Sequence, residues 1–114
     1  MKRFTRSLGH AVRGIRYAFA GRNFRIQSVA AVVVVCLSAY FKISAGEWLV
    51  IIFAIGLVLS LEATNTALEE ICNKFHPVTH PHIALIKDLA AGAVLISSLT
   101  TLAIGLIIFL PYFL

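Results

Sequence analysis

Three uncharged, strongly apolar runs, separated by short polar stretches, dominate the chain. They cover 26–41, 48–61 and 89–110. The third run is long enough for a membrane-spanning helix, because its length at 1.5 Å per residue is about 33 Å, close to the hydrocarbon thickness of a bilayer. The other two reach that length only if their helices continue into polar sequence, backward through 23–27 and forward through 62–74. We therefore predict three transmembrane helices, over 26–41, 47–75 and 86–110.

The first 25 residues follow another pattern, in which apolar residues recur at helical spacing among basic ones. Seven of the ten Lys and Arg residues of the chain lie here, with no acid among them. The apolar positions are Phe4, Leu8, Ala11, Ile15, Ala18 and Phe19. Such a segment is typical of an amphipathic helix that lies on an anionic membrane surface, rather than of a nucleic-acid-binding arm. It has no apolar core of the kind that a signal peptide needs.

Composition supports the membrane interpretation. Of 114 residues, 60% are hydrophobic and 13% are charged, and the mean hydropathy is +0.92. A soluble domain has about a quarter charged residues, and a domain this small buries only part of its surface in a core. The fold class predicted is an all-α membrane protein with a single domain over 1–114, whose arm is 1–25. Cys36 and Cys72 are each expected to be a small buried thiol, not paired in a disulfide.

The distribution of positive charge predicts the orientation. The arm is strongly basic, the 62–88 connection contains Lys74 and Lys87, and the 42–47 connection contains only Lys42. Because cytoplasmic segments are enriched in Lys and Arg, we expect the N-terminus and the 62–88 connection in the cytoplasm and the C-terminus outside.

Breaker residues predict where the second and third helices are separated. No proline occurs in 47–75, and the helix is expected to stop at His76-Pro77, before a turn-like stretch over 78–82. Asp88 would then either cap the third helix or pair with Lys87.

The acids are the most informative residues of the chain. Glu62, Asn65, Glu69 and Asn73 are spaced so that they fall within roughly 80° of one another on an α-helix. A carboxylate near membrane depth is costly and is usually paired or functional. The alternative is a polar face that only joins helices through hydrogen bonds.

Lys87 and Asp88 add a cation and another carboxylate across a short connection. Carboxylates, amides and a lysine are suited to a magnesium–nucleotide complex, because Mg²⁺ prefers oxygen ligands shared with phosphates and phosphoryl transfer needs mainly positioning and charge neutralisation. A second possibility is zinc, since the spacing of a cysteine and three histidines could provide ligands. These are Cys72, His76, His80 and His82. No Walker A motif or dinucleotide fingerprint is present.

Two segments resemble signatures of the prokaryotic diacylglycerol kinase and undecaprenol kinase family. Residues 62–69, Glu-Ala-Thr-Asn-Thr-Ala-Leu-Glu, resemble its E-x-x-N-[ST]-A-[IL]-E motif. His80-Pro81 and the run 87–95, Lys-Asp-Leu-Ala-Ala-Gly-Ala-Val-Leu, resemble its H-P…K-D-x-A-A-G-A-V-L motif. The resemblance extends over essentially the whole chain. It implies a homotrimer of three-span subunits with an N-terminal surface helix and shared active sites at the cytoplasmic boundary of a bacterial inner membrane.

The resemblance also implies roles on the second helix. Glu62 corresponds to the catalytic base that takes the proton of the lipid hydroxyl. Glu69 corresponds to a nucleotide-binding carboxylate that bridges to the metal, and Asn65 to an amide that orders the nucleotide site.

Further residues correspond to nucleotide contacts. Lys87 and Asp88 match a nucleotide-contacting pair, and His80 lies where the preceding loop touches the nucleotide. On the arm, Arg3 and His10 fall near positions that contact ATP, with His10 in place of a tyrosine. The implied activity is an ATP- and Mg²⁺-dependent kinase for a lipid alcohol, either diacylglycerol or undecaprenol; the 41–48 connection resembles the undecaprenol branch.

One position departs from the family pattern. The family usually has an acid just before the segment matching 22–25, and it shares the metal with the second-helix glutamate; here that residue is Gly21. Either Glu69 holds the metal with fewer ligands, or another acid such as Glu70 helps, or activity is weakened. Two rival functions follow from other classes: a catalytically weakened membrane scaffold of the same fold, and a small proton-linked carrier that uses Glu62.

Overall fold

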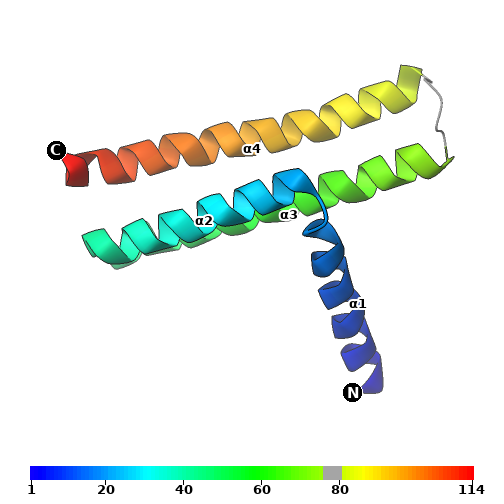
Figure 1. The fold of residues 1–114 in the computed structure, drawn as a ribbon, viewed down its shortest axis with the longest axis horizontal. Coiled ribbons are helices and arrows are strands. Elements are labelled where there is room, and N and C mark those ends of the chain that lie inside the picture. Colours follow the sequence, from blue (N-terminus) through cyan, green and yellow to red (C-terminus); the bar gives the residue numbers. More distant parts are fainter. Residues whose placement is uncertain (76–80) are drawn as a thin grey trace.

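The computed structural model describes residues 1–75 and 81–114, apart from the side chain of Phe75. In these ranges it consists of four α-helices, α1 (Lys2–Ala18), α2 (Arg22–Phe41), α3 (Ala45–Phe75) and α4 (Pro81–Phe113). The last three are long and apolar enough to cross a membrane. Figure 1 shows α2 and α4 running alongside α3, while α1 leaves this bundle at a steep angle. The all-helical, three-span architecture predicted from the sequence is therefore confirmed.

As predicted, α2 and α3 continue beyond their apolar runs into polar sequence. α2 begins at Arg22 and α3 extends to Phe75, so both short apolar runs become spans of sufficient length. The arm is shorter than predicted, because α1 ends at Ala18 and residues 22–25 already belong to α2.

The third span begins earlier than predicted, at Pro81 instead of at position 86. Proline is tolerated at the first position of a helix, because the N–H group that it lacks would have no partner there. Asp88 consequently lies inside α4, and the interpretation of Asp88 as its N-terminal cap is wrong. α3 ends at Phe75, next to the predicted stop; His76, Pro77 and 78–80 lie outside the described residues.

A tight turn joins α1 to α2. The N–H groups of Ala20 and Gly21 donate to the carbonyl oxygens of Tyr17 and Ala18, each at 3.0 Å. Gly21 is extended, with φ −78° and ψ 138°, and it precedes the first residue of α2. The chain thus changes direction within three residues, which gives α1 its steep angle to the bundle.

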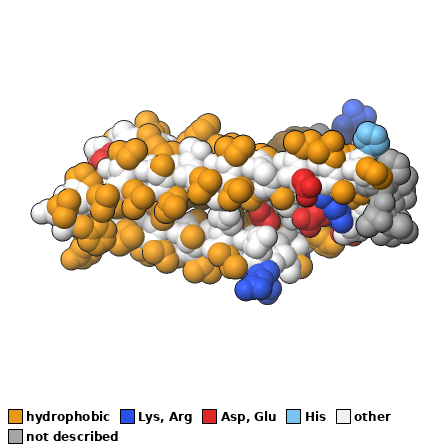
Figure 2. All heavy atoms as spheres, turned by 90° about the horizontal axis from the view of Figure 1, so that it is seen from above, with side chains coloured by type: hydrophobic (Ala, Val, Ile, Leu, Met, Phe, Trp, Pro, Cys, Tyr) orange, Lys and Arg blue, Asp and Glu red, His pale blue; other side chains and the backbone are white. Residues whose placement is uncertain are grey.

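Apolar side chains pack together at the end of the bundle where α2 ends and α3 begins. Ile43, Ile51, Ile108 and Phe109 form a buried cluster against which Phe41 packs. Most other large apolar side chains are exposed, as expected for helices that face lipid. In Figure 2 hydrophobic atoms cover most of the face that α4 occupies, and charged side chains gather near the end that carries the 76–80 connection.

Candidate functional site

The predicted polar stripe on α3 is buried at its start. Glu62 retains 4% of its exposed surface and Asn65 retains 7%, whereas Glu69 and Asn73, one and two turns further on, are exposed. Glu62 lies about 26 Å along α3 from Ala45, which is close to the far boundary of a hydrocarbon layer. The stripe therefore begins inside the protein and ends on its exposed surface.

An amide joins two members of the stripe. Nδ2 of Asn65 donates a hydrogen bond of 3.2 Å to Oε1 of Glu69, one helical turn away. Oδ1 of the same Asn65 is fully buried and has no hydrogen-bond partner among the described residues. An unpaired buried acceptor costs about 1–3 kcal/mol and is rare in folded proteins. This oxygen therefore retains an unmet capacity to accept a hydrogen bond.

Lys87 completes the polar group from the other helix. Its Nζ donates to Oδ1 of Asn73 at 2.6 Å, so the stripe faces α4. The structure thus brings the predicted residues Glu62, Asn65, Glu69 and Lys87 to one side of α3. Asp88 is the next residue on α4 and is exposed.

Two predicted nucleotide contacts lie elsewhere. Arg3 and His10 are exposed on α1, and the guanidinium of Arg13 donates to Nδ1 of His10 at 2.6 Å. No hydrogen bond or ion pair joins either Arg3 or His10 to the stripe in the described part of this one chain. His80 lies outside the described residues.

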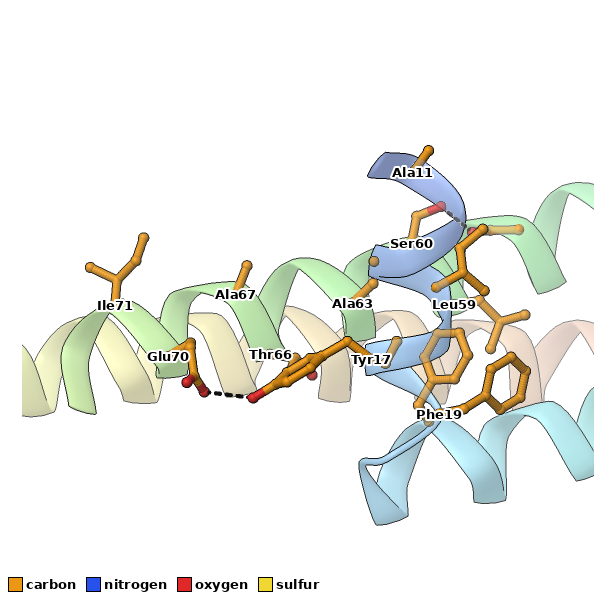
Figure 3. A pocket seen from close by; sticks show the side chains of 15 residues that line it. Ala11, Tyr17, Phe19, Leu59, Ser60, Ala63, Thr66, Ala67, Glu70 and Ile71 are labelled. Atoms are coloured by element: carbon orange, nitrogen blue, oxygen red, sulfur yellow. Dashed lines mark hydrogen bonds between the residues drawn. The ribbon is translucent and has the colours of Figure 1, made fainter. Parts of the chain in front are cut away.

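Glu70 points to a different side of α3 from Glu69. Its Oε2 accepts a hydrogen bond of 3.1 Å from the hydroxyl of Tyr17 on α1 (Figure 3). This hydrogen bond, and with it the negative charge of Glu70, raises the pKa of the Tyr17 phenol above its usual value of about 10, with a smaller contribution from burial. Sequence reasoning missed Tyr17, because its partner is 53 positions away along the chain.

The thiols and the possible zinc ligands are dispersed. Cys72 is buried as predicted, but Cys36 is exposed on α2, so the expectation of a buried thiol is wrong there. Within 1–75 and 81–114, no group of three or more His, Cys, Asp and Glu side chains is placed to hold a metal ion. The zinc alternative also involves His76 and His80, which lie outside the described residues.

Comparison with known proteins extends these observations. The family model described as prokaryotic diacylglycerol kinase matches residues 9–109. The chain is 39% identical over 112 residues to the undecaprenol kinase of Bacillus subtilis (strain 168), which covers 97% of this chain and 91% of that protein. It is 36% identical over 107 residues to the diacylglycerol kinase of Synechocystis sp. (strain ATCC 27184 / PCC 6803 / Kazusa), which covers 92% and 61% of the two chains. The diacylglycerol kinase of Escherichia coli (strain K12) is 26% identical over 96 residues, with 83% and 79% covered.

Proposed function

Because the chain belongs to the prokaryotic diacylglycerol kinase family and is a lipid kinase, we propose that its polar stripe is where phosphate passes from ATP to a lipid alcohol. One observation carries the proposal: α3 buries Glu62 one turn before an Asn65 oxygen that has no hydrogen-bond partner in 1–75 and 81–114. A protein that only packed helices together would pair these groups, because burying them unpaired costs stability. Their availability is what a reaction site requires.

Glu62 is the proposed catalytic base. No hydrogen bond or ion pair to its carboxylate occurs within the described residues, so both oxygens can accept a proton from a hydroxyl within hydrogen-bond reach. The lipid O–H bond breaks as its proton moves to Glu62. The lipid oxygen bonds to the γ-phosphorus of ATP, and the bond from that phosphorus to the β-phosphate oxygen breaks, releasing ADP.

The residues present fit a magnesium ion. Glu69 offers carboxylate oxygens, and the hydrogen bond that its Oε1 accepts from Nδ2 of Asn65 holds this side chain in place. Mg²⁺ prefers such ligands together with substrate phosphates, and when bound it would neutralise phosphate charge. We propose Glu69 as the metal-bridging carboxylate and Asn65 as the amide that orders the site.

Lys87 is proposed to bind phosphate. Its ammonium group already lies at the exposed end of the stripe, where Asn73 accepts its hydrogen bond. Exchange of that amide for a phosphate oxygen would replace a neutral acceptor by a charged one, which makes a stronger hydrogen bond. Asp88, His80, Arg3 and His10 stay proposed nucleotide contacts on the family resemblance.

Assembly and orientation are also proposals. The three apolar spans show a multi-pass membrane protein of a prokaryotic family. We propose a homotrimer with the N-terminus in the cytoplasm of a bacterial cell. Since α1 leaves the bundle of its own chain, an arm from a neighbouring subunit is the proposed source of the contacts from Arg3 and His10.

The lipid substrate is diacylglycerol or undecaprenol. We propose undecaprenol as the preferred substrate, on the resemblance of the 41–48 connection and the 39% identity to the Bacillus subtilis undecaprenol kinase. The 36% identity to the Synechocystis diacylglycerol kinase makes a parallel assay with both lipids essential.

The test is phosphorylation of each lipid by purified protein in detergent–lipid micelles with γ-labelled ATP and Mg²⁺. We expect labelled lipid from the wild type and almost none from Glu62→Gln or Glu69→Gln. Glu47→Gln is the matched control, because Glu47 is an acid on the same helix that belongs to the other end of the span. Absence of product from folded wild-type protein with both lipids would refute the proposal.

Gly21 favours a second candidate, a weakened scaffold, because the family usually has an acid there. A Cβ atom at Gly21 would lie 3.3 Å from the carbonyl oxygen of Ala18, so a side chain there requires this backbone atom to move by a few tenths of an ångström. If the missing acid limits activity, Gly21→Glu will raise lipid phosphorylation at limiting Mg²⁺, while Gly21→Gln will not. An inactive wild type that Gly21→Glu activates would favour the scaffold.

A further inference from the structure

A polar interaction joins α1 to α3, and it lies next to the turn between α1 and α2. The Tyr17 hydroxyl donates to Oε2 of Glu70 at 3.1 Å, and Figure 3 shows the Tyr17 ring reaching from α1 along α3 toward that carboxylate. Ala18, the next residue, is buried to 3% exposure. Phe19 packs edge-on against Phe24 of α2, with ring centroids 4.8 Å apart. The turn between α1 and α2 is therefore held by apolar packing at Ala18 and Phe19, with the Tyr17–Glu70 hydrogen bond beside it.

Packing alone does not fix the direction of α1. A groove of about 870 Å³, with almost entirely apolar walls, separates much of α1 from α3. Its walls include Gly14 and Ala11 on α1 and Gly56 and Ala63 on α3, and added Cβ atoms at the two glycines would meet nothing within 4 Å. Close-packed helices resist tilting because side chains interdigitate, and these surfaces do not interdigitate.

We propose that Tyr17 and Glu70 are a positioning pair that sets the angle of α1 to the bundle and so the placement of Arg3 and His10 for the kinase reaction. The claim about the placement of Arg3 and His10 rests on the proposed function. α1 is about 25 Å long, so a small rotation at Ala18 moves the Arg3 end by many ångströms. A single hydrogen bond close to Ala18 therefore has a large effect on the position of the Arg3 end of α1.

The chemistry of Tyr17 and Glu70 favours a hydrogen bond that persists at physiological pH. A phenol that donates to a carboxylate makes a charge-assisted hydrogen bond, which is stronger than one between neutral groups. The elevated pKa of Tyr17 keeps its proton in place throughout the physiological range. The assignment also separates the two adjacent acids: Glu69 is bonded to Asn65 within the stripe, whereas Glu70 is bonded to the arm.

A distance measurement tests directly whether the pair sets the angle of α1 to the bundle. Spin labels would be placed at Ser7 on α1 and at Leu49 on α3, both exposed, in a Cys36→Ala/Cys72→Ala background. Labelled chain is diluted with an excess of unlabelled chain, so that pulsed EPR reports distances within one chain. We expect one narrow distribution for the parent protein and a broadened, shifted distribution for Tyr17→Phe and for Glu70→Ala. Glu70→Gln retains an acceptor oxygen and should stay close to the parent.

Enzyme kinetics test whether the pair places Arg3 and His10 for the kinase reaction. We expect Tyr17→Phe and Glu70→Ala each to raise the KM for ATP about three- to tenfold with a smaller change in kcat, and the double variant to be no worse than either single one. Tyr112→Phe is the matched control, because it removes the other tyrosine hydroxyl that donates to a carboxylate, that of Glu47. It should change neither the distance distribution nor the KM for ATP.

The outcomes distinguish two claims: that Tyr17 and Glu70 set the angle of α1, and that this angle places Arg3 and His10 for the reaction. An unchanged distance distribution in folded Tyr17→Phe overturns the positioning pair, whatever the kinetics. A broadened distribution with an unchanged KM for ATP overturns the role of the pair in placing Arg3 and His10. Lack of lipid kinase activity in the wild type refutes the proposed function instead, while the distances still decide whether Tyr17 and Glu70 hold the arm.

Discussion

The two ends of α3 use the same kind of side chain in opposite ways. At the first turn, Oε1 of Glu47 accepts hydrogen bonds from the N–H of Ser44 at 2.9 Å and from the hydroxyl of Tyr112 at 2.7 Å. The Ser44 hydroxyl accepts in return from the N–H of Glu47 at 3.1 Å, which completes a reciprocal capping box. Here the carboxylate is committed to the architecture, since it begins one helix and ties it to the end of another.

The far half of α3 leaves two of its buried polar side chains incompletely paired. Glu62 is buried without a side-chain partner in the described part of the chain, and Asn65 buries an oxygen that accepts no hydrogen bond there. A helix gains stability from Glu47 and loses it at Glu62 and Asn65. The contrast teaches that the number of acids on a helix says little about function, whereas the number of their unmet hydrogen bonds says a good deal.

The sharpest way to test this contrast is to remove the carboxylate of Glu62. Glu62→Leu should reduce lipid phosphorylation at least about a hundredfold, because the general base is lost. Thermal unfolding in detergent should be unchanged or shifted upward, because an apolar side chain replaces an unpaired buried acid. A large drop in the melting temperature would mean that Glu62 holds the fold, and the contrast between the ends would disappear.

Asn65→Ala is expected to have the next largest effect. Activity should fall about ten- to hundredfold, as for losses of groups that orient a metal ligand. Stability should change little, because the substitution removes an unpaired oxygen together with the hydrogen bond to an exposed Glu69. Activity at saturating Mg²⁺ and a melting curve of the same preparation provide the two readouts.

Glu47→Ala should show the reverse pattern. Loss of the capping box and of the Tyr112 hydrogen bond should lower the melting temperature by a few degrees. The kcat and KM of the folded protein should stay at the wild-type level. A loss of activity beyond the loss of folded protein would show that the first turn of α3 takes part in the reaction.

The smallest expected effect is the titration of Tyr17. Its pKa is raised in the folded protein, so the bond to Glu70 contributes fully below pH about 10 and is lost as the pH rises through the elevated value. A difference titration of tyrosinate absorbance, wild type minus Tyr17→Phe, should place this phenol above the usual tyrosine range. In Glu70→Ala the same difference curve should return toward it.

Much of the fold could be predicted from sequence because it depends on local pattern. Hydrophobic runs located the three spans, and the spacing of Glu62, Asn65 and Glu69 placed them on one side of α3. The start of α4 at Pro81 was missed because proline was taken as a separator, although it also serves as a first helical residue.

Contacts between distant segments were beyond the reach of pattern. The pairing of Tyr17 with Glu70 depends on the angle of α1, which a turn of three residues sets and no periodicity encodes. The unpaired oxygen of Asn65 is likewise a property of the folded packing, since an isolated helix would leave it in water. Lys87 was expected near the stripe, but its partner Asn73 emerged only from the fold.

The length of α3 has a consequence for membranes of different thickness. Its 31 residues extend about 46 Å, whereas a hydrocarbon layer is about 30 Å thick. Glu62 lies about 26 Å along the helix from Ala45, so the depth of its carboxylate depends on how much of that length the bilayer covers. A thicker bilayer would submerge that carboxylate and a thinner one would lift it into water, so acyl-chain length becomes a control over how easily a lipid headgroup and a water-borne nucleotide meet.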